Sequence, residues 1–530
     1  MSKVVLLSIN SKYVHSSLSV WLLAGGVSRY ARLPHDVQVV EATIHLDSCD
    51  IAQSVAALGP DVVGISAYIW NAGKLPQLLQ SLRDRLPDAV FVLGGPEAAY
   101  NAEYWLENGA DFVVRGEGEY NFAMLLDALT ESKPAPAQTE SPPPGEPIDP
   151  YGDAYFNALN NRIAYLETSR GCPFQCTFCL SGGSGVRFFP MQSVKRQIYR
   201  LSQSGAKTIK LVDRTFNCNA ARAYELLVYI IGLETTCCFH FEVAADLFDD
   251  RTLELLASAP PGRIQIEAGL QSFFAPALEA TVRQTDLNKA QRNIETILRG
   301  RNIHVHVGLI AGLPYETLED FKDSFNRAYA FGAHTVQLGF LKLLHGSRLR
   351  EQAPSFKLQY CAAPPYEIES TPWLGAQDVQ TLKQTENALQ HTYNKGRFLS
   401  ALEYILAVSG IDPFELFYKL GQTVPHHGTP LPEYADKLYG FFAGLPGVDS
   451  DELADRMVCD WLSMVKGKNM PASLKRDGRN QVAKIAQSLL GREITRNEAA
   501  LLRAGKGVFV DVTDRDPVTM LYRLHFVDIL

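Results

Sequence analysis

The sequence of 530 residues lacks several features that define large classes of protein. No stretch approaches the ~20 apolar residues of a membrane-spanning helix. The apolar run near Met1 is too short for a secretory signal, and no small-residue cleavage site follows it. The net charge of −8 gives no overall positive field that would attract nucleic acid. We therefore expect a cytoplasmic protein with no membrane segment, and we do not expect nucleic acid as a partner.

Cysteine is scarce and unevenly placed. The chain has 9 cysteines, an odd number, and only Cys172, Cys176 and Cys179 have a functional spacing. Scattered thiols in a long chain are typical of a reducing compartment rather than of a disulfide-stapled secreted protein. The hydrophobic share of 46% and the charged share of 20% are those of a globular protein. The length predicts about two to four domains.

Residues 1–130 alternate apolar runs with amphipathic stretches. Apolar strands separated by single helices are typical of a parallel sheet covered on both faces. We therefore expect an α/β, Rossmann-like, doubly wound domain with five parallel strands. No Gly-x-Gly-x-x-Gly follows the first strand, which argues against a dinucleotide site. The expected strands are Val4–Ile9, Val37–Ala42, Asp61–Ser66, Val90–Gly94 and Phe112–Val114.

Three further regions follow this domain. Residues 131–155 are rich in proline and polar groups and predict an extended linker. Residues 156–362 repeat strand and helix about six times, which predicts a partial (β/α)6 barrel of the TIM type. Residues 363–530 predict a mostly helical domain, with a last helix at Glu498–Ala504 and a possible strand pair after it. The expected barrel strands are Ile163–Glu167, Thr208–Val212, Phe239–Val243, Arg263–Glu267, His304–Gly308 and Thr335–Phe340.

The three close cysteines follow the first barrel strand, in the run Thr168-Ser-Arg-Gly-Cys-Pro-Phe-Gln-Cys-Thr-Phe-Cys. Barrel enzymes place their chemistry at this end of the strands. Gaps of three and then two residues let three thiolates bind three corners of a cubane iron–sulfur cluster and leave the fourth iron open. A zinc knuckle would need a fourth ligand in paired spacing, which no Cys or His pair supplies. Three unrelated thiols are the other alternative.

The triplet resembles the signature of the radical S-adenosylmethionine (SAM) superfamily, Cys-x3-Cys-x-aromatic-Cys. Phe178 occupies the aromatic position, and Gly171 precedes the first cysteine. The resemblance implies that Cys172, Cys176 and Cys179 hold a [4Fe–4S] cluster whose open iron binds SAM. It further implies that an electron from the cluster cleaves SAM to a 5′-deoxyadenosyl radical. A flavodoxin or a ferredoxin is the electron donor we expect.

The same resemblance implies SAM contacts at the ends of the barrel strands. Asp213 and Arg214 end the second strand, and Gly308-Leu-Ile-Ala-Gly312 is similar to the fifth-strand segment whose backbone approaches adenine. For the acidic members the alternative is a buried charge that pairs with a neighbouring Arg or Lys. The full expected set is Phe178, Asp213, Arg214, Glu242, Glu267, Gln271, Ser272, Gly308, Ile310 and Gly312.

Residues 1–130 are similar to the cobalamin-binding domain of cobalamin-dependent radical SAM enzymes. Gly94-Gly-Pro and Arg115-Gly-Glu-Gly-Glu119 carry this resemblance, at the strand ends where such sheets bind ligands. The Asp-x-His-x-x-Gly motif that supplies a histidine to cobalt is missing; His15 is the candidate in its place, and an ordinary loop histidine is the alternative. A scaffold without a ligand is the alternative for the whole domain. The expected cobalamin contacts are Asn10, His15, Ser66, Tyr68, Gly94, Gly95, Gly116 and Glu117.

Together the two resemblances imply an enzyme that uses a [4Fe–4S] cluster, SAM and cobalamin to methylate an unactivated carbon of a small-molecule or peptide substrate. Cyclisation or rearrangement without methyl transfer is the first alternative, and a non-catalytic sensor of cobalamin or redox state is the second. Methylthiolation of transfer RNA would need a second cluster, and Cys49 is the only cysteine in residues 1–130. No motif identifies the substrate.

Overall fold

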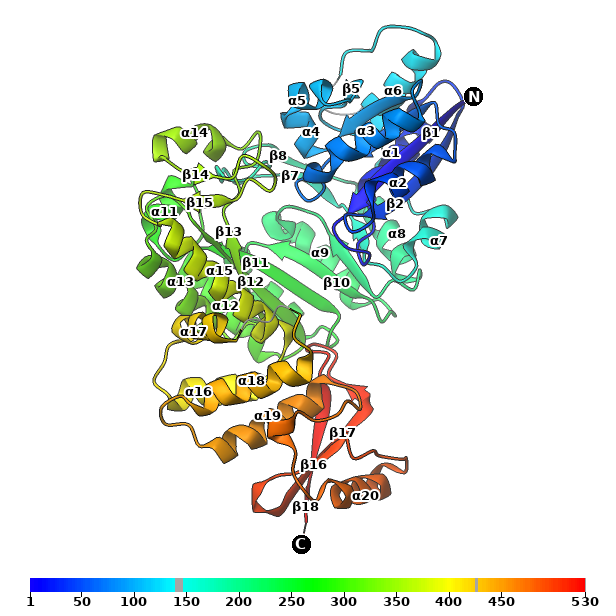
Figure 1. Cartoon of the computed structure of the whole chain (residues 1–530). Coiled ribbons are helices and arrows are strands. Elements are labelled where there is room, and N and C mark those ends of the chain that lie inside the picture. Colours follow the sequence, from blue (N-terminus) through cyan, green and yellow to red (C-terminus); the bar gives the residue numbers. More distant parts are fainter. Residues whose placement is uncertain (139–145, 425–427, 530) are drawn as a thin grey trace. The chain divides into compact units, whose positions relative to one another are not determined.

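The computed structural model describes residues 1–138, 146–424 and 428–529, which Figure 1 colours in chain order. Part of the predicted linker, residues 139–145, lies outside the described residues. The chain forms two compact units that do not follow the predicted domain boundaries, and those boundaries stay predictions. The first unit contains residues 1–243, 281–284 and 341–371, and the second contains residues 244–280, 285–340 and 372–530.

The amino-terminal region is a doubly wound domain, as predicted. Its strands are β1 (Ser2–Asn10), β2 (His35–Thr43), β3 (Val62–Ser66), β4 (Val90–Gly94) and β5 (Phe112–Val113), and its helices are α1 (Leu18–Tyr30), α2 (Ser48–Ala56), α3 (Leu75–Arg85), α4 (Pro96–Tyr100), α5 (Ala102–Glu107) and α6 (Gly118–Thr130). The strands pair in parallel in the order β2-β1-β3-β4-β5. Along β1, Leu7 and Ile9 enter one core and Val4 and Leu6 enter another. Both faces of the sheet are therefore covered by helices.

The central region contains a six-stranded sheet. Its strands are β6 (Ala164–Leu166), β9 (Thr208–Leu211), β10 (Cys238–Val243), β11 (Ile264–Gln271), β12 (Ile303–Ala311) and β13 (Thr335–Phe340). The order β13-β12-β11-β10-β9-β6 confirms the predicted partial barrel. Its helices are α7 (Asp153–Leu159), α8 (Met191–Ser202), α9 (Ala220–Ile231), α10 (Asp250–Ala257), α11 (Ala275–Ala280), α12 (Leu287–Arg299) and α13 (Leu318–Ala330). In β11 and β12 buried residues alternate with half-exposed ones, so one face of these strands packs in the core and the other stays accessible.

A short hairpin that the sequence did not predict follows β6. Its strands, β7 (Ser169–Cys172) and β8 (Gly185–Phe188), pair antiparallel, and Cys176 and Cys179 lie in the loop between them. The hairpin needs a glycine at position 171: φ is +93°, and a Cβ there would lie 1.8 Å from the carbonyl oxygen of Gly185.

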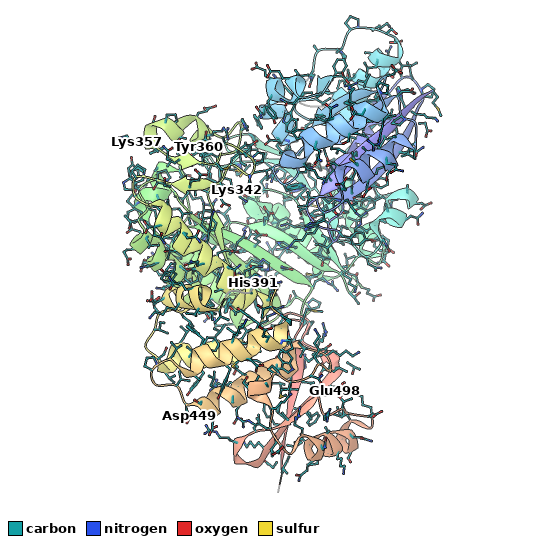
Figure 2. All side chains as sticks on the ribbon, in the orientation of Figure 1. Lys342, Lys357, Tyr360, His391, Asp449 and Glu498 are labelled. Atoms are coloured by element: carbon teal, nitrogen blue, oxygen red, sulfur yellow. The ribbon has the colours of Figure 1, made fainter. Side chains whose placement is uncertain are left out.

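A segment that follows the barrel belongs to the first compact unit. Residues 341–371, which we call the strap, form α14 (Arg348–Phe356), β14 (Gln359–Tyr360) and β15 (Ile368–Ser370). Figure 2 labels Tyr360 on this segment. The strap is bonded to the amino-terminal domain, because the buried hydroxyl of Tyr366 donates to Glu97 over 2.6 Å.

The carboxyl-terminal region is helical up to residue 490. Its helices are α15 (Ala376–His391), α16 (Leu399–Val408), α17 (Pro413–Thr423), α18 (Leu431–Ala443), α19 (Ser450–Met464) and α20 (Arg479–Leu490). The helix predicted at Glu498–Ala504 is wrong. There β16 (Ala499–Leu501) and a single 3-10 turn precede β17 (Lys506–Arg515) and β18 (Tyr522–Asp528), which confirm the predicted strand pair. Alanine and leucine favour helix, but pairing of Ala499 with Phe509 overrides that preference.

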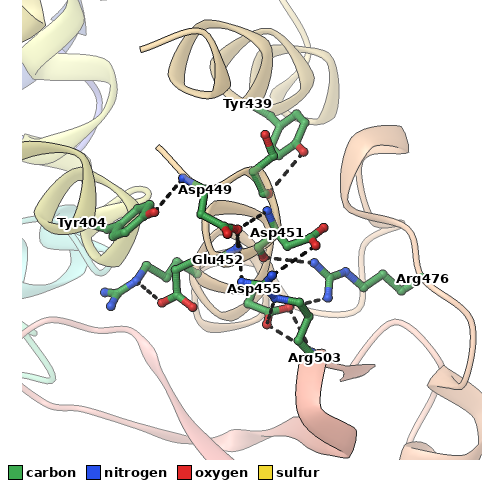
Figure 3. Close-up of polar contacts among 10 residues, drawn as sticks. Tyr404, Tyr439, Asp449, Asp451, Glu452, Asp455, Arg476 and Arg503 are labelled. Atoms are coloured by element: carbon green, nitrogen blue, oxygen red, sulfur yellow. Dashed lines mark hydrogen bonds and ion pairs between the residues drawn. The ribbon is translucent and has the colours of Figure 1, made fainter. Parts of the chain in front are cut away.

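Ion pairs fasten this small sheet to α19. Arg503 contacts Asp449 and Asp451 over 3.1 Å each, and its backbone N–H donates to Asp455 (Figure 3). Asp449 also accepts bonds from the first backbone N–H groups of α19, where a negative charge is favourable. Among the described residues, none of the helices combines the length and the apolar character needed to cross a membrane.

Candidate active site

The three predicted cluster cysteines lie together on the β7–β8 hairpin. Cys172 ends β7 and is buried, Cys176 is buried, and Cys179 is half-buried; all three thiols are free. Backbone bonds from Cys179 N to Cys176 O and from Gly182 N to Cys179 O, each 3.2 Å, coil the loop into successive turns. Phe178 lies half-buried between the last two cysteines. The hairpin therefore presents the triplet as one compact turn.

The electrostatics of the triplet suit a cationic cluster. Burial raises the pKa of the Cys179 thiol, Arg214 lowers it, and the neighbouring Cys172 and Cys176 raise it further. Three mutually repelling thiolates need a positive partner, which bound iron supplies. Arg283 Nη1, 3.7 Å from Cys176 Sγ, adds one fixed positive charge.

A zinc knuckle requires ligands that converge on a single ion. Across the described residues, no three His, Cys, Asp or Glu side chains converge closely enough to hold a single metal ion. A cubane differs in this respect, because each thiolate binds a different iron and the sulfurs stay farther apart. The arrangement therefore fits the cluster better than the zinc knuckle.

Asp213 holds the start of the hairpin. Its buried carboxylate accepts bonds from Thr168 N over 3.0 Å, from Thr168 Oγ1 over 2.6 Å and from Ser169 Oγ over 2.5 Å. Burial raises the pKa of this carboxyl even though those bonds favour its charged form. Glu242 lies 3.1 Å from Lys210 Nζ. Glu242 thus has the lysine partner that the alternative expects, whereas Asp213 accepts from a backbone N–H and two hydroxyls. The contacts of both acids with SAM stay predictions.

The remaining predicted SAM residues lie in the second compact unit. Gln271 and Ser272 follow each other at the end of β11, but Ser272 is fully buried, and its hydroxyl donates to the Glu316 carboxylate. The accessible face of β11 and β12 carries the others. Glu267, Gln271, Gly308 and Ile310 share that half-exposed face, and Gly312 follows it with φ +89°.

The predicted cobalamin loops gather at the carboxyl edge of the amino-terminal sheet. Ser66 and Gly94 face each other in the register of β3 and β4. The Ser66 hydroxyl is buried without a hydrogen-bond partner, which fits a site that awaits a polar ligand atom. A Cβ on Gly95, where φ is +94°, would lie 2.6 Å from the carbonyl oxygen of Ala67, so glycine lets the two loops approach closely. These features fit cobalamin.

Other predicted cobalamin residues are already engaged. His15 Nδ1 lies 2.6 Å from the Tyr165 hydroxyl, and burial, with Lys12 and Lys210, lowers its pKa. Asn10 donates to His15 O over 3.0 Å and to Glu41 over 2.9 Å. The ordinary structural role is therefore well supported for both, and cobalt ligation by His15 stays a prediction.

The neighbouring loop carries an aromatic stack. Tyr68 stacks on Trp70 with ring centroids 4.3 Å apart, and Trp70 is 45% exposed. The indole N–H donates to Ile9 O over 3.1 Å, which fixes the ring over the sheet edge. A flat apolar surface of this kind suits a large ring ligand.

Arg170 is a site residue that the sequence reasoning missed. It pairs with Glu117 and Glu119 of the amino-terminal domain, and its Nε lies 2.8 Å from Glu167 Oε2. Glu117, predicted to contact cobalamin next to Gly116, also pairs with Arg187 of β8 over 2.5 Å. Burial raises the pKa of Glu167 to about 7, although Arg170 lowers it. The acidic loop and the arginine before Gly171 were visible in the sequence, but their meeting depends on the fold.

Comparison with known families identifies the two cofactor domains. Residues 4–126 match the B12 binding domain, and residues 166–328 match the Radical SAM superfamily. Residues 354–505 match a protein family of unknown function, DUF4080. The chain therefore joins a B12-binding domain to a radical SAM domain, the architecture of cobalamin-dependent radical SAM enzymes. Its cofactors are cobalamin, SAM and a [4Fe–4S] cluster.

Individual relatives point to the same group. The chain is 26% identical over 356 residues to the uncharacterized methyltransferase PH0819 of Pyrococcus horikoshii, a match covering 61% of this chain and 76% of that protein. It is 25% identical to the anaerobic magnesium-protoporphyrin IX monomethyl ester cyclase of Rubrivivax gelatinosus, over 59% of this chain and 60% of the cyclase. Matches to several other curated relatives span 47% to 58% of their length.

A solved structure shares the fold. The radical SAM methyltransferase TsrM of Kitasatospora setae, solved with tryptophan substrate and a SAM analogue, aligns with a TM-score of 0.57 at 16% identity. The alignment covers 92% of this chain and 100% of that chain. At this identity the likeness concerns the fold.

Proposed function

We propose that this protein is a cobalamin-dependent radical SAM enzyme that methylates an unactivated carbon of a small-molecule or peptide substrate. The cysteine triplet on the β7–β8 hairpin, one domain after a B12-binding sheet, is the observation that carries the proposal. When bound, the cluster supplies the electron that cleaves SAM to a carbon-centred radical, and cobalamin supplies a methyl carrier.

The chain's own residues position and protect these groups. Asp213 fixes the backbone from which the hairpin starts, and Arg283 lies beside Cys176. The buried hydroxyl of Ser66 offers a hydrogen bond to the cobalamin nucleotide tail, and the exposed ring of Trp70 offers a flat contact to the corrin. An electron donor such as flavodoxin or ferredoxin completes the proposed system in a cytoplasmic setting.

Anaerobic reconstitution tests the radical step. Protein loaded with iron, sulfide and cobalamin and treated with a reductant should convert SAM to 5′-deoxyadenosine. The Cys176→Ala variant should lose the cluster and this activity but retain cobalamin, because we assign the two cofactors to different domains. Cys49→Ala, which removes an exposed thiol far from the triplet in sequence, is the matched control. Protein that contains a full cluster but does not cleave SAM would refute the proposed radical chemistry.

A cyclisation or rearrangement without methyl transfer is the second candidate, favoured by the likeness to the cyclase of Rubrivivax gelatinosus. The products formed from SAM distinguish methyl transfer from cyclisation or rearrangement. Methyl transfer to carbon consumes one SAM as methyl donor and one as radical source, so S-adenosylhomocysteine and 5′-deoxyadenosine form in about equal amounts. A cyclase forms 5′-deoxyadenosine without a matching amount of S-adenosylhomocysteine.

A further inference from the structure

Arg170 connects the two cofactor regions of the first compact unit. It lies in β7, two residues before Cys172, and its guanidinium reaches the loop after β5, which was predicted to contact cobalamin. Glu117 and Glu119 from that loop and from the start of α6 both pair with it. The cluster hairpin and the B12-binding domain are thus joined directly through this side chain.

All three nitrogen atoms of the Arg170 guanidinium donate hydrogen bonds to carboxylates. Nη1 and Nη2 both bond to Glu119, with the Nη1 bond to Oε2 at 3.2 Å, and Nε bonds to Glu167 Oε2 over 2.8 Å. Three carboxylates, one from α6, one from the residue before it and one from the residue after β6, therefore converge on one planar cation. Lysine has a single ammonium without this planar fork and cannot reproduce the arrangement.

The contact is sheltered and is reinforced from the second strand of the hairpin. The side chain of Arg170 is 21% exposed and that of Glu119 is 9% exposed, so water screens the pair weakly. Arg187 of β8 shares Glu117, and both guanidinium groups lie over the ring of Phe189, at 5.8 Å and 5.6 Å. Both strands of the cluster hairpin are thereby tied to the same loop.

From this convergence we propose that Arg170 is a positioning residue that fixes the distance between the iron–sulfur cluster and cobalamin. The inference rests on the proposed function, which places the two cofactors on either side of this contact. Breaking the fork leaves the cysteines and the cobalamin loops intact but removes the ion pairs of Arg170 with Glu117 and Glu119, so the hairpin is held less firmly against the B12-binding domain. Radical chemistry needs fixed spacing, since misplacement of about 1 Å costs about 100-fold in rate.

Pulsed electron paramagnetic resonance measures that spacing directly. In wild-type protein loaded with cob(II)alamin and a one-electron-reduced cluster, we expect a single narrow distance distribution between the two spins. Arg170→Met removes the charge and the fork while keeping an unbranched side chain, and it should at least double the width of the distribution. Iron and corrin contents should remain within about a fifth of wild type, which separates positioning from cofactor binding.

The controls keep the test decisive. Arg200→Met removes a guanidinium that is also part of the first unit, 43% exposed and paired with Asp149 over 2.6 Å, and it should leave the distribution unchanged. Arg170→Lys should broaden it as well, because charge alone does not restore the fork. If Arg170→Met does not fold, Glu119→Gln removes a charged partner of Arg170 at similar size and should broaden the distribution.

Two results would overturn the inference, and they differ from each other. A fully loaded Arg170→Met protein with the wild-type distance distribution would show that the contact does not set the spacing, while the proposed function stands. Wild-type protein that takes up no cobalamin would remove the proposed function and this inference together.

Discussion

Gly171 shapes the cluster hairpin through the side chain that it lacks. It lies between Arg170 and Cys172, its φ is +93°, and a Cβ at this position would lie 1.8 Å from Gly185 O. The left-handed backbone alone would cost an alanine about 1–3 kcal/mol, and the overlap adds to that. The pairing of β7 with β8 therefore depends on this position.

We expect Gly171→Ala to separate the two strands and to lower the iron content of reconstituted protein to less than half of wild type. Cobalamin content should not change, since the B12-binding sheet does not include this residue. Gly152→Ala is the control: φ there is −96° and no atom lies within 4 Å of an added Cβ. Iron analysis and the visible absorption of the cluster measure this loss. A wild-type iron content in Gly171→Ala would contradict the prediction.

Glu316 makes stability depend on pH. Its carboxylate is buried, accepts a bond from Ser272, and leaves Oε2 without a partner; burial raises its pKa to about 8. Because the folded state holds this proton more tightly than the unfolded state, its contribution is fully present below pH 4.5 and is lost as pH rises through about 8. The difference reaches about 5 kcal/mol at most.

Native-state hydrogen exchange of α13 measures this effect. In wild type the opening free energy of α13 should fall as the pH rises from 5 to 9. Glu316→Gln, which imitates the protonated acid, should remove most of this pH dependence. Glu319→Gln changes a neighbouring carboxylate that is 79% exposed and should leave the slope as it is. Equal slopes in wild type and Glu316→Gln would refute the prediction.

At the scale of elements, the strap links distant parts of the first unit. Leu349 N donates to Thr177 O of the cluster loop over 2.8 Å, while Tyr366 donates to Glu97 beside the Gly94-Gly95 turn. Burial raises the pKa of Glu97, and the Tyr366 bond partly offsets this. One segment therefore bonds to both cofactor regions.

Tyr366→Phe should loosen the strap, because it removes one of the donors to the buried Glu97 carboxyl, at a cost of about 1–3 kcal/mol. Limited proteolysis should then cut within residues 341–371 several times faster than in wild type. Tyr360→Phe, on the half-exposed β14, removes a hydroxyl from the same segment and should have no such effect (Figure 2). In the Glu97→Gln background the effect of Tyr366→Phe should shrink.

The strap also shows where prediction from sequence ends. The strand–helix alternation predicted both sheets, since period and length are local signals. The spacing of the three cysteines predicted the site of the iron–sulfur cluster. The strap, the pairing of β7 with β8 and the partners of Arg170 depend on contacts between residues far apart in the chain. Local propensity even misassigned Glu498–Ala504, where pairing with β17 decides the structure.

At the scale of the whole molecule, the chain separates its tasks by region. The B12-binding sheet, the cluster hairpin and the strap lie in the first compact unit, and the carboxyl-terminal helices lie in the second. The sheet β16-β17-β18 is fastened to α19 by Arg503 and its three aspartates. A cofactor that binds the first unit should therefore change local stability there and leave α19 unaffected.

Hydrogen–deuterium exchange of the full chain with and without hydroxocobalamin tests this division. We expect slower exchange in the loops after β3 and β4, residues 66–71 and 94–98, and in the Arg170 contact at residues 115–119, because a ligand that binds the folded state suppresses local opening. Exchange in α19 should stay the same. Cobinamide, a corrin without the nucleotide tail, is the matched ligand. It should protect residues 66–71 and 94–98 less than hydroxocobalamin does, because Trp70 still meets the corrin while the unpartnered Ser66 hydroxyl and the close Gly95 turn lack the tail. Protection confined to the carboxyl-terminal helices, or equal protection by both corrins at these two loops, would contradict this placement of the cofactor.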